Sequence, residues 1–204
     1  MNTNQMNTGR GYWLAWFLAS AMGYGMGAIL GTGIAYGPLS KRVPDVVLGI
    51  LVGIVMGAIG GYSQWVVLRE RIAGAGWWGL ASALGFGSAI GALEAADTGE
   101  SFAAATVIMG SVLGIVSGIL QWLILRRKVA HAGWWLVASC IGSLIGFLDF
   151  RFVVALGEAG KWTQAILTFG LVFGAGYGAI TGAMLIWLLR QSSAGEVDIF
   201  ATAH

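Results

Sequence analysis

Three stretches decide the fold of this chain: GIVMGAIGG (Gly53–Gly61), GSVLGIVSG (Gly110–Gly118) and GAGYGAITG (Gly174–Gly182). Each has glycine at every fourth residue, and each ends eight residues before an arginine. A spacing of four places the glycines on one helix face, where a second backbone can approach closely. The pattern predicts helix-packing roles for Gly53, Gly57, Gly61, Gly110, Gly114, Gly118, Gly174, Gly178 and Gly182.

The composition of the chain indicates a membrane protein. Of its 204 residues, 57% are hydrophobic and only 10% are charged, whereas a soluble domain carries roughly 25% charged residues. Its 34 glycines also suit helices that pack within lipid. A net charge of +2 is too small for a nucleic-acid-binding protein. The single cysteine, Cys140, has no partner in the chain and says little about the redox compartment.

The apolar runs predict a six-span, all-α membrane protein, since a helix needs about 20 apolar residues to cross a bilayer. The first run is longer than the apolar region of a signal peptide, so we expect it to be a permanent span. We expect residues 1–190 to form one transmembrane domain and 191–204 a short, polar, disordered tail. The predicted spans are Tyr12–Tyr36, Val46–Leu68, Trp77–Leu93, Phe102–Leu125, Trp134–Leu148 (with a continuation to Leu156 left open) and Trp162–Leu189.

The distribution of basic residues predicts that both termini are cytoplasmic. The termini and the second and fourth connections hold Arg10, Arg69, Arg71, Arg126, Arg127, Lys128 and Arg190. The other three connections hold only Lys41, Arg42, Arg151 and Lys161.

The spans also repeat. Trp77-Trp78, Ser82 and Gly85 recur 57 residues later as Trp134-Trp135, Ser139 and Gly142, with a looser copy at Trp16, Ser20 and Gly23. Gln64-Trp65 recurs as Gln121-Trp122, but the third copy aligns Leu185 and Ile186 there. A fixed period indicates one supersecondary unit used repeatedly. We expect three helical hairpins, at about 12–68, 77–125 and 134–190, arranged either with pseudo-threefold symmetry or in a linear row.

The strings QWVVLRERIAGAGWW (Gln64–Trp78) and QWLILRRKVAHAGWW (Gln121–Trp135) carry a resemblance. They resemble a pattern of small, uncharacterised bacterial multi-pass membrane proteins, in which Gln-Trp, a basic turn and Trp-Trp recur between glycine-rich spans. The resemblance implies an architecture and no activity, so it transfers no functional residues.

Four polar residues are candidates for an intramembrane role. Gln64 and Gln121 are expected to hydrogen-bond between helices, with a polar passage as the alternative. Asp149 and Arg151 are functional candidates if they lie within the hydrocarbon, but they belong to the outer headgroups if the fifth span ends near Leu148. Glu94 follows the same logic.

The cytoplasmic ends of the spans are rich in tryptophan, and these residues favour an interfacial belt over an aromatic ligand site. They are Trp65, Trp77, Trp78, Trp122, Trp134, Trp135 and Trp187. His131 and His204 lie outside the spans, so no intramembrane histidine is available for a haem or chlorophyll. No catalytic constellation or metal-ligand spacing stands out, so we expect neither an enzyme nor a metal or other cofactor.

Two functions fit these patterns. The first is a packing or accessory protein, whose partners are the bilayer and other membrane subunits, a hydrophobic ligand or further copies of itself. The second is a small-molecule or ion transporter or channel with a pathway between the hairpins, because transporter sites often lie between repeats. The spans lack proline and hold few ionisable groups, and the proline–acid–basic signature of three-hairpin mitochondrial carriers is absent, so we favour the first.

Overall fold

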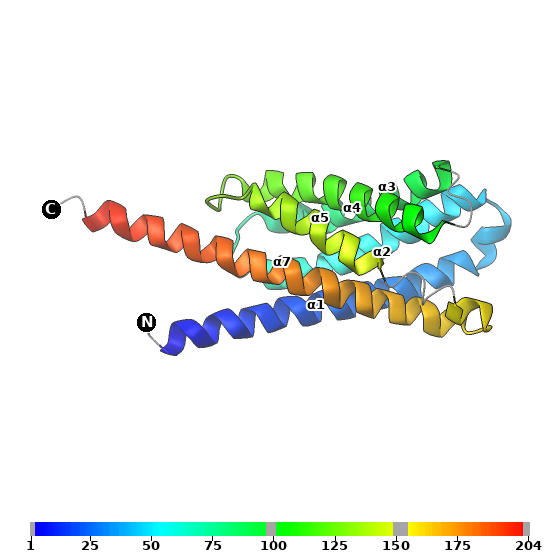
Figure 1. The fold of residues 1–204 in the computed structure, drawn as a ribbon, viewed down its shortest axis with the longest axis horizontal. Coiled ribbons are helices and arrows are strands. Elements are labelled where there is room, and N and C mark those ends of the chain that lie inside the picture. Colours follow the sequence, from blue (N-terminus) through cyan, green and yellow to red (C-terminus); the bar gives the residue numbers. More distant parts are fainter. Residues whose placement is uncertain (1–2, 97–100, 149–154, 202–204) are drawn as a thin grey trace.

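The computed structural model describes residues 3–96, 101–148 and 155–201, and within these ranges its regular elements are all helices (Figure 1). The main helices are α1 (Thr3–Ala35), α2 (Asp45–Leu68), α3 (Trp78–Ala95), α4 (Phe102–Leu125), α5 (Trp134–Phe147) and α7 (Trp162–Ala201). Short 3₁₀ turns, η1 (Pro38–Lys41) and η2 (Ala75–Trp77), lie before α2 and α3. The helix α7 continues into the predicted polar tail, as far as Ala201.

Within the described residues, four helices and not the predicted six are long and apolar enough to cross a membrane. They are Gly9–Ala35, Asp45–Leu68, Ala103–Leu125 and Trp162–Gln191. The fifth predicted span is the 14-residue α5, which covers only about 21 Å of a roughly 30 Å hydrocarbon core. The third is the 18-residue α3, which is rich in glycine, alanine and serine and carries Glu94 near its end. The four long apolar helices identify a multi-pass membrane protein.

The six main helices close into a ring. Each packs against the next along the chain, and α7 packs against both α5 and α1. The two termini lie at one end of the molecule, together with the α2–α3 and α4–α5 connections (Figure 1). This basic end of the molecule therefore carries Arg10, the two arginine-containing connections and Arg190.

The two connections at the basic end turn in the same way. Gly74 has φ +85° in the first and His131 has φ +55° in the second, and the two positions are 57 residues apart. This left-handed conformation costs glycine little but is uncommon for a side chain such as histidine. The equivalent turns place Trp78 and Trp135 at the start of α3 and α5.

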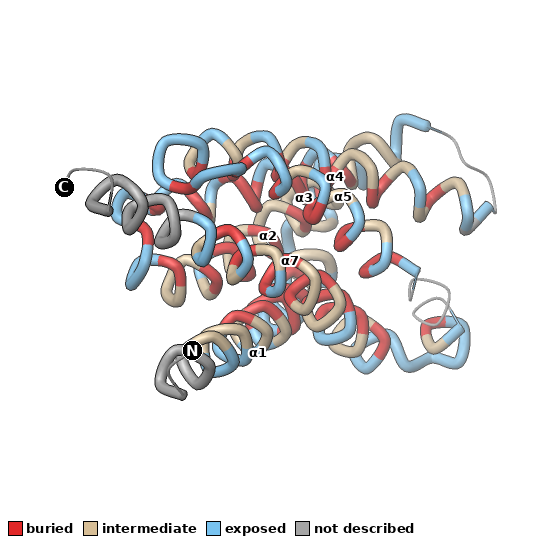
Figure 2. Tube along the Cα trace, turned by 60° about the vertical axis from the view of Figure 1, so that its left-hand side comes forward, coloured by how far each residue is buried: buried red, intermediate tan, exposed pale blue. Residues whose placement is uncertain are grey.

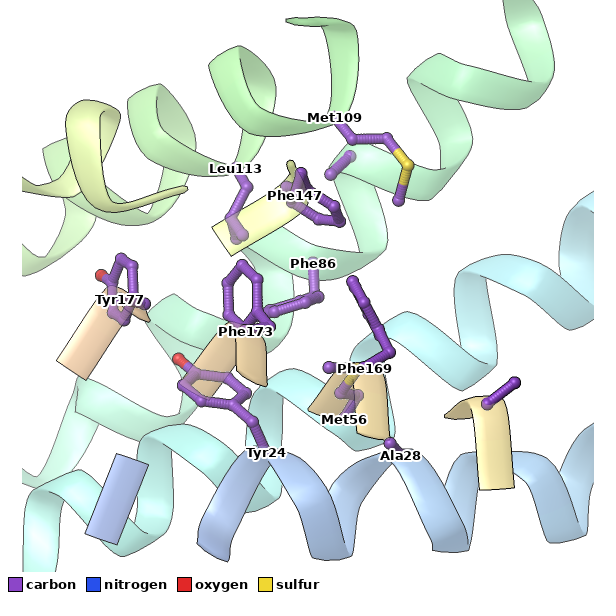
Figure 3. Packing of buried hydrophobic residues seen from close by; sticks show 12 residues of the cluster. Tyr24, Ala28, Met56, Phe86, Met109, Leu113, Phe147, Phe169, Phe173 and Tyr177 are labelled. Atoms are coloured by element: carbon purple, nitrogen blue, oxygen red, sulfur yellow. The ribbon is translucent and has the colours of Figure 1, made fainter. Parts of the chain in front are cut away.

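The centre of the ring is filled at two levels. Near the basic end, a tryptophan cluster draws buried residues from all six helices; it includes Trp16, Leu68, Trp78, Leu125, Trp135 and Leu185. Further along, a phenylalanine cluster again draws on all six; it includes Tyr24, Met56, Phe86, Met109, Phe147 and Phe173 (Figure 3). Ring centroids in this second cluster lie 5.1 Å apart for Phe86–Phe173, Phe147–Phe173 and Tyr24–Phe173.

Each helix has exposed turns on its outer side (Figure 2), and many of the side chains exposed there are large and apolar. Large side chains such as Met22 (67% exposed), Val107 (56%) and Ile145 (46%) point outward. In water such a surface would drive association, whereas in a bilayer it is the surface that lipid tails contact.

Candidate functional site

The buried glutamines form two matching hydrogen-bond sets. In the first, Nε1 of Trp78 donates to Oε1 of Gln64 at 3.0 Å, and Nε2 of Gln64 donates to Oγ of Ser20 at 3.0 Å. All three side chains are inaccessible to solvent. One carboxamide of α2 therefore joins α1 to α3, and it uses both its acceptor and a donor in doing so.

The second set repeats the first 57 to 62 residues later. Nε1 of Trp135 donates to Oε1 of Gln121 at 3.0 Å, and Nε2 of Gln121 donates to Oγ of Ser82 at 3.0 Å. The hydroxyl of Tyr177 adds a longer bond to the same Oε1 at 3.4 Å. The amide of α4 thus joins α3, α5 and α7.

A third set exists in reduced form. Nε1 of Trp16 donates to Oγ1 of Thr181 at 3.1 Å, and that hydroxyl donates to the carbonyl of Tyr177 at 2.7 Å. Threonine accepts the indole N–H as the glutamines do. Its hydroxyl donates within α7, however, and it makes no hydrogen bond to a serine of any other helix that the structure describes. Ser139, the counterpart of Ser20 and Ser82, is fully buried and its Oγ has no hydrogen-bond partner among the described residues.

The three tryptophans of these sets meet at the centre of the ring. Trp16, Trp78 and Trp135 lie with ring centroids 5.2 to 6.1 Å apart in edge-to-face contacts. Edge-to-face packing places the positive rim of one ring against the negative face of another. The sets therefore form a closed aromatic centre surrounded by amides and hydroxyls.

Three of the predicted glycines, one on each of α2, α4 and α7, lie directly against the backbone of another helix. A Cβ atom on Gly57 would lie 2.8 Å from Cα of Ala83, and one on Gly114 would lie 2.6 Å from Cα of Cys140. The matching contact on α7 is made by Gly174, whose Cβ would lie 2.8 Å from Cα of Ala21. Each of these partners follows one of the three equivalent serines.

The contacts of α7 match those of α2 and α4 when the third glycine trio is shifted by one helical turn from the predicted alignment. Gly61 and Gly118 face Ser82 and Ser139, and the α7 residue facing Ser20 in the same way is Gly178. The third trio is therefore Gly170, Gly174 and Gly178, which makes Thr181 the counterpart of the glutamines in place of Leu185. Gly182 lies instead against Trp16 and Trp13.

The tryptophan belt is divided by the structure. Trp77, Trp134 and Trp187 are 69%, 53% and 40% exposed, as a belt requires, but Trp78 and Trp135 are fully buried. Trp65 and Trp122 are half-buried beneath Arg69 and Arg126, whose guanidinium carbons lie 5.3 and 5.5 Å from the ring centroids. The second tryptophan of each Trp-Trp pair thus belongs to the interior, where it bonds to glutamine.

Of the charged candidates, Asp149 and Arg151 lie outside the described residues. Glu94 is exposed at the end of α3. Within the described ranges, histidine, cysteine, aspartate and glutamate nowhere gather in a group of three that could hold a metal ion.

Sequence reasoning missed Thr181, Tyr177 and the pairing of serine with glutamine. The signal was a shift of 60 residues, which aligns Gln121 with Thr181 and Ser117 with Tyr177. In chemical terms the site consists of neutral donors and acceptors that bond to one another, so it fixes the positions of helices and shows no group prepared for catalysis.

Comparisons with protein families, curated proteins and solved structures find no match to this chain. The resemblance of the two glutamine–tryptophan strings therefore identifies no family, and the architecture itself is what supports a multi-pass helical membrane protein.

Proposed function

We propose that this protein is a non-enzymatic packing or accessory component of a membrane, which presents a rigid helical ring to lipids or to helices of other membrane proteins. Its setting in this proposal is a bacterial inner membrane, with the basic end in the cytoplasm, because positive residues concentrate on the cytoplasmic side.

The observation that carries this proposal is the filled interior. The tryptophan and phenylalanine clusters each draw on all six helices, and their largest side chains are fully buried. The buried amides bond to indoles and hydroxyls rather than to a passage. A close-packed core resists rearrangement, whereas alternating access requires one repeat to rock against another.

The outer surface supplies the second argument. Exposed aliphatic side chains lie on α1, α4, α5 and α7, and they give partner helices or acyl chains an apolar surface on several sides. Helix association in lipid depends on close packing rather than on hydrophobic burial. A rigid ring loses little conformational freedom when such a contact forms.

Native purification in mild detergent, followed by mass spectrometry and an absorption spectrum, tests this proposal. We expect reproducible, stoichiometric membrane-protein partners or a bound hydrophobic ligand. A partner-free, colourless particle that conducts a solute across liposomes, with flux lost in Gln64→Leu and Gln121→Leu, would overturn the proposal in favour of a transporter.

A further inference from the structure

A cavity of about 370 Å³ opens at the surface between α1 and the end of α2, at the basic end of the molecule. We name it the α1–α2 groove. Its walls are of two kinds. Ala15, Val66 and Val67 form an apolar part, whereas Tyr12, Glu70 and Arg71 form a polar part at the end of the helices. The volume lies within the range of small-ligand sites, about 300–1,000 Å³.

The polar part holds a positioned cation. The guanidinium carbon of Arg71 lies 5.5 Å from the ring centroid of Tyr12, and the Tyr12 hydroxyl donates to the carbonyl of Val67 at 3.4 Å. The exposed guanidinium keeps its planar set of N–H donors available to an anion. Stacking on a half-buried ring also restricts its rotamers, so less freedom is lost when an anion binds.

The surrounding charge is positive. Arg10 precedes the groove residue Gly11 along α1, and Nη2 of Arg190 lies beside Gly9 on the side of α1 that faces α7. Glu70 is the one acid in the groove lining and Arg71 is its one cation; Arg10 and Arg190 belong to the same basic end of the molecule but not to the lining. An anion with an apolar portion fits this combination better than a cation or a wholly polar solute.

We propose that the α1–α2 groove binds one anionic phospholipid, with its phosphate at Arg71 and its glycerol backbone against Ala15 and Val66. The groove is too small for a whole lipid, so the acyl chains run along the exposed α1 residues Leu18 and Met22. Basic residues at the cytoplasmic surface attract anionic lipids in general. The groove adds a shape that selects a position for one of them.

The α4–α5 connection offers a matched control. Lys128 lies 57 residues after Arg71, in the equivalent connection, and is likewise exposed. A surface that only attracts anionic lipid by charge responds equally to the loss of either residue. A groove that recognises one lipid responds to Arg71 alone.

The test is native mass spectrometry of the full chain released from nanodiscs of phosphatidylcholine with or without phosphatidylglycerol. We expect wild type to retain one phosphatidylglycerol. Arg71→Gln removes the charge and should lose this adduct. Ala15→Leu fills the groove at an exposed position without a change of charge and should also lose it. Lys128→Gln should retain it.

Three results would overturn the inference. Equal retention of phosphatidylcholine by wild type removes the selectivity for an anion. Equal loss from Lys128→Gln and Arg71→Gln makes the binding a general effect of surface charge. Retention by Ala15→Leu places the lipid outside the groove. None of these depends on whether the protein has partners, so the proposed function is tested separately.

Discussion

At the residue scale, two residue types hold the interior together. Glycine has no Cβ and so lets neighbouring backbones approach, and serine hydroxyls accept hydrogen bonds from the buried glutamines. Gly114 brings α4 against the backbone of α5, since its Cβ would meet Cα and N of Cys140 rather than a flexible side-chain tip. Backbone cannot move aside without shifting the whole helix. The residue beyond the contact, Ile119, is 40% exposed on the outer surface of the same helix.

Gly114→Leu should therefore destabilise the protein by about 1–3 kcal/mol or more, the usual cost of overpacking. Thermal unfolding in detergent, followed by size-exclusion fluorescence, measures this effect. The control Ile119→Leu keeps a side chain of similar volume at an exposed position and should melt like wild type. Equal melting temperatures for the two variants would contradict the packing role of Gly114.

The equivalent serines give a second, sharper comparison. Ser82→Ala leaves Nε2 of Gln121 without its acceptor in a buried site, which costs about 1–3 kcal/mol. Ser139→Ala removes a buried hydroxyl that has no partner among the described residues, so it should be neutral or stabilising. The same thermal assay compares them. A larger loss for Ser139→Ala than for Ser82→Ala would refute the assignment of the reduced third set.

At the element scale, α7 and α1 pack against each other as a pair, although they lie at opposite ends of the chain. Gly174 and Gly178 meet α1 through the same contacts that Gly57 and Gly61 make with α3. The side chain of Arg190 lies beside Gly9, so the ends of this pair are adjacent. The termini thus lie where a basic connection joins the helices of the α2–α3 pair and of the α4–α5 pair.

A circular permutant should therefore fold. We would join Arg190 to Arg10 by a flexible linker as long as the α2–α3 connection, and open the chain between Ala130 and His131. Because the cut lies in a connection between helices and not inside one, we expect a monodisperse peak and a melting temperature within about 5 °C of wild type. The control opens the chain between Leu113 and Gly114, inside α4, and should fail to assemble. Failure of both permutants to assemble would count against the packing of α7 on α1.

How much of this was readable from sequence differs by element. The glycine spacing predicts close backbone approach, but it does not say which helix each glycine face meets; the structure places those faces against α3, α5 and α1. The alignment of the third glycine trio could not be fixed, because Gly170, Gly174, Gly178 and Gly182 form four equally spaced glycines. The position equivalent to the two glutamines holds Thr181, so no glutamine marks it. The fifth helix ends at Phe147, within one residue of the predicted Leu148, but its 14 residues are fewer than the about 20 that a span needs. The depths of Asp149 and Arg151 stay a prediction.

At the scale of the whole molecule, the helices form a ring with an aromatic interior and an apolar exterior. The interior explains why helices of unequal length stay together, since the two clusters join residues from all six. The ring depends on its closure. If α7 did not pack against α1, the third hydrogen-bond set and both clusters would open to the surroundings.

Disulfide formation between α1 and α7 in intact membranes tests this closure most directly. A Cβ on Gly25 would lie 2.8 Å from Cδ2 and 3.7 Å from the backbone N of Leu171, so Gly25→Cys with Leu171→Cys brings two thiols within bonding reach. Cys140→Ala removes the native thiol, and a protease site in the α4–α5 connection allows the halves to separate. The matched control replaces Gly25→Cys by Met26→Cys, which is 54% exposed. The closed ring predicts that oxidised halves stay joined for the first pair and separate for the control; separation of both, or equal joining of both, would contradict it.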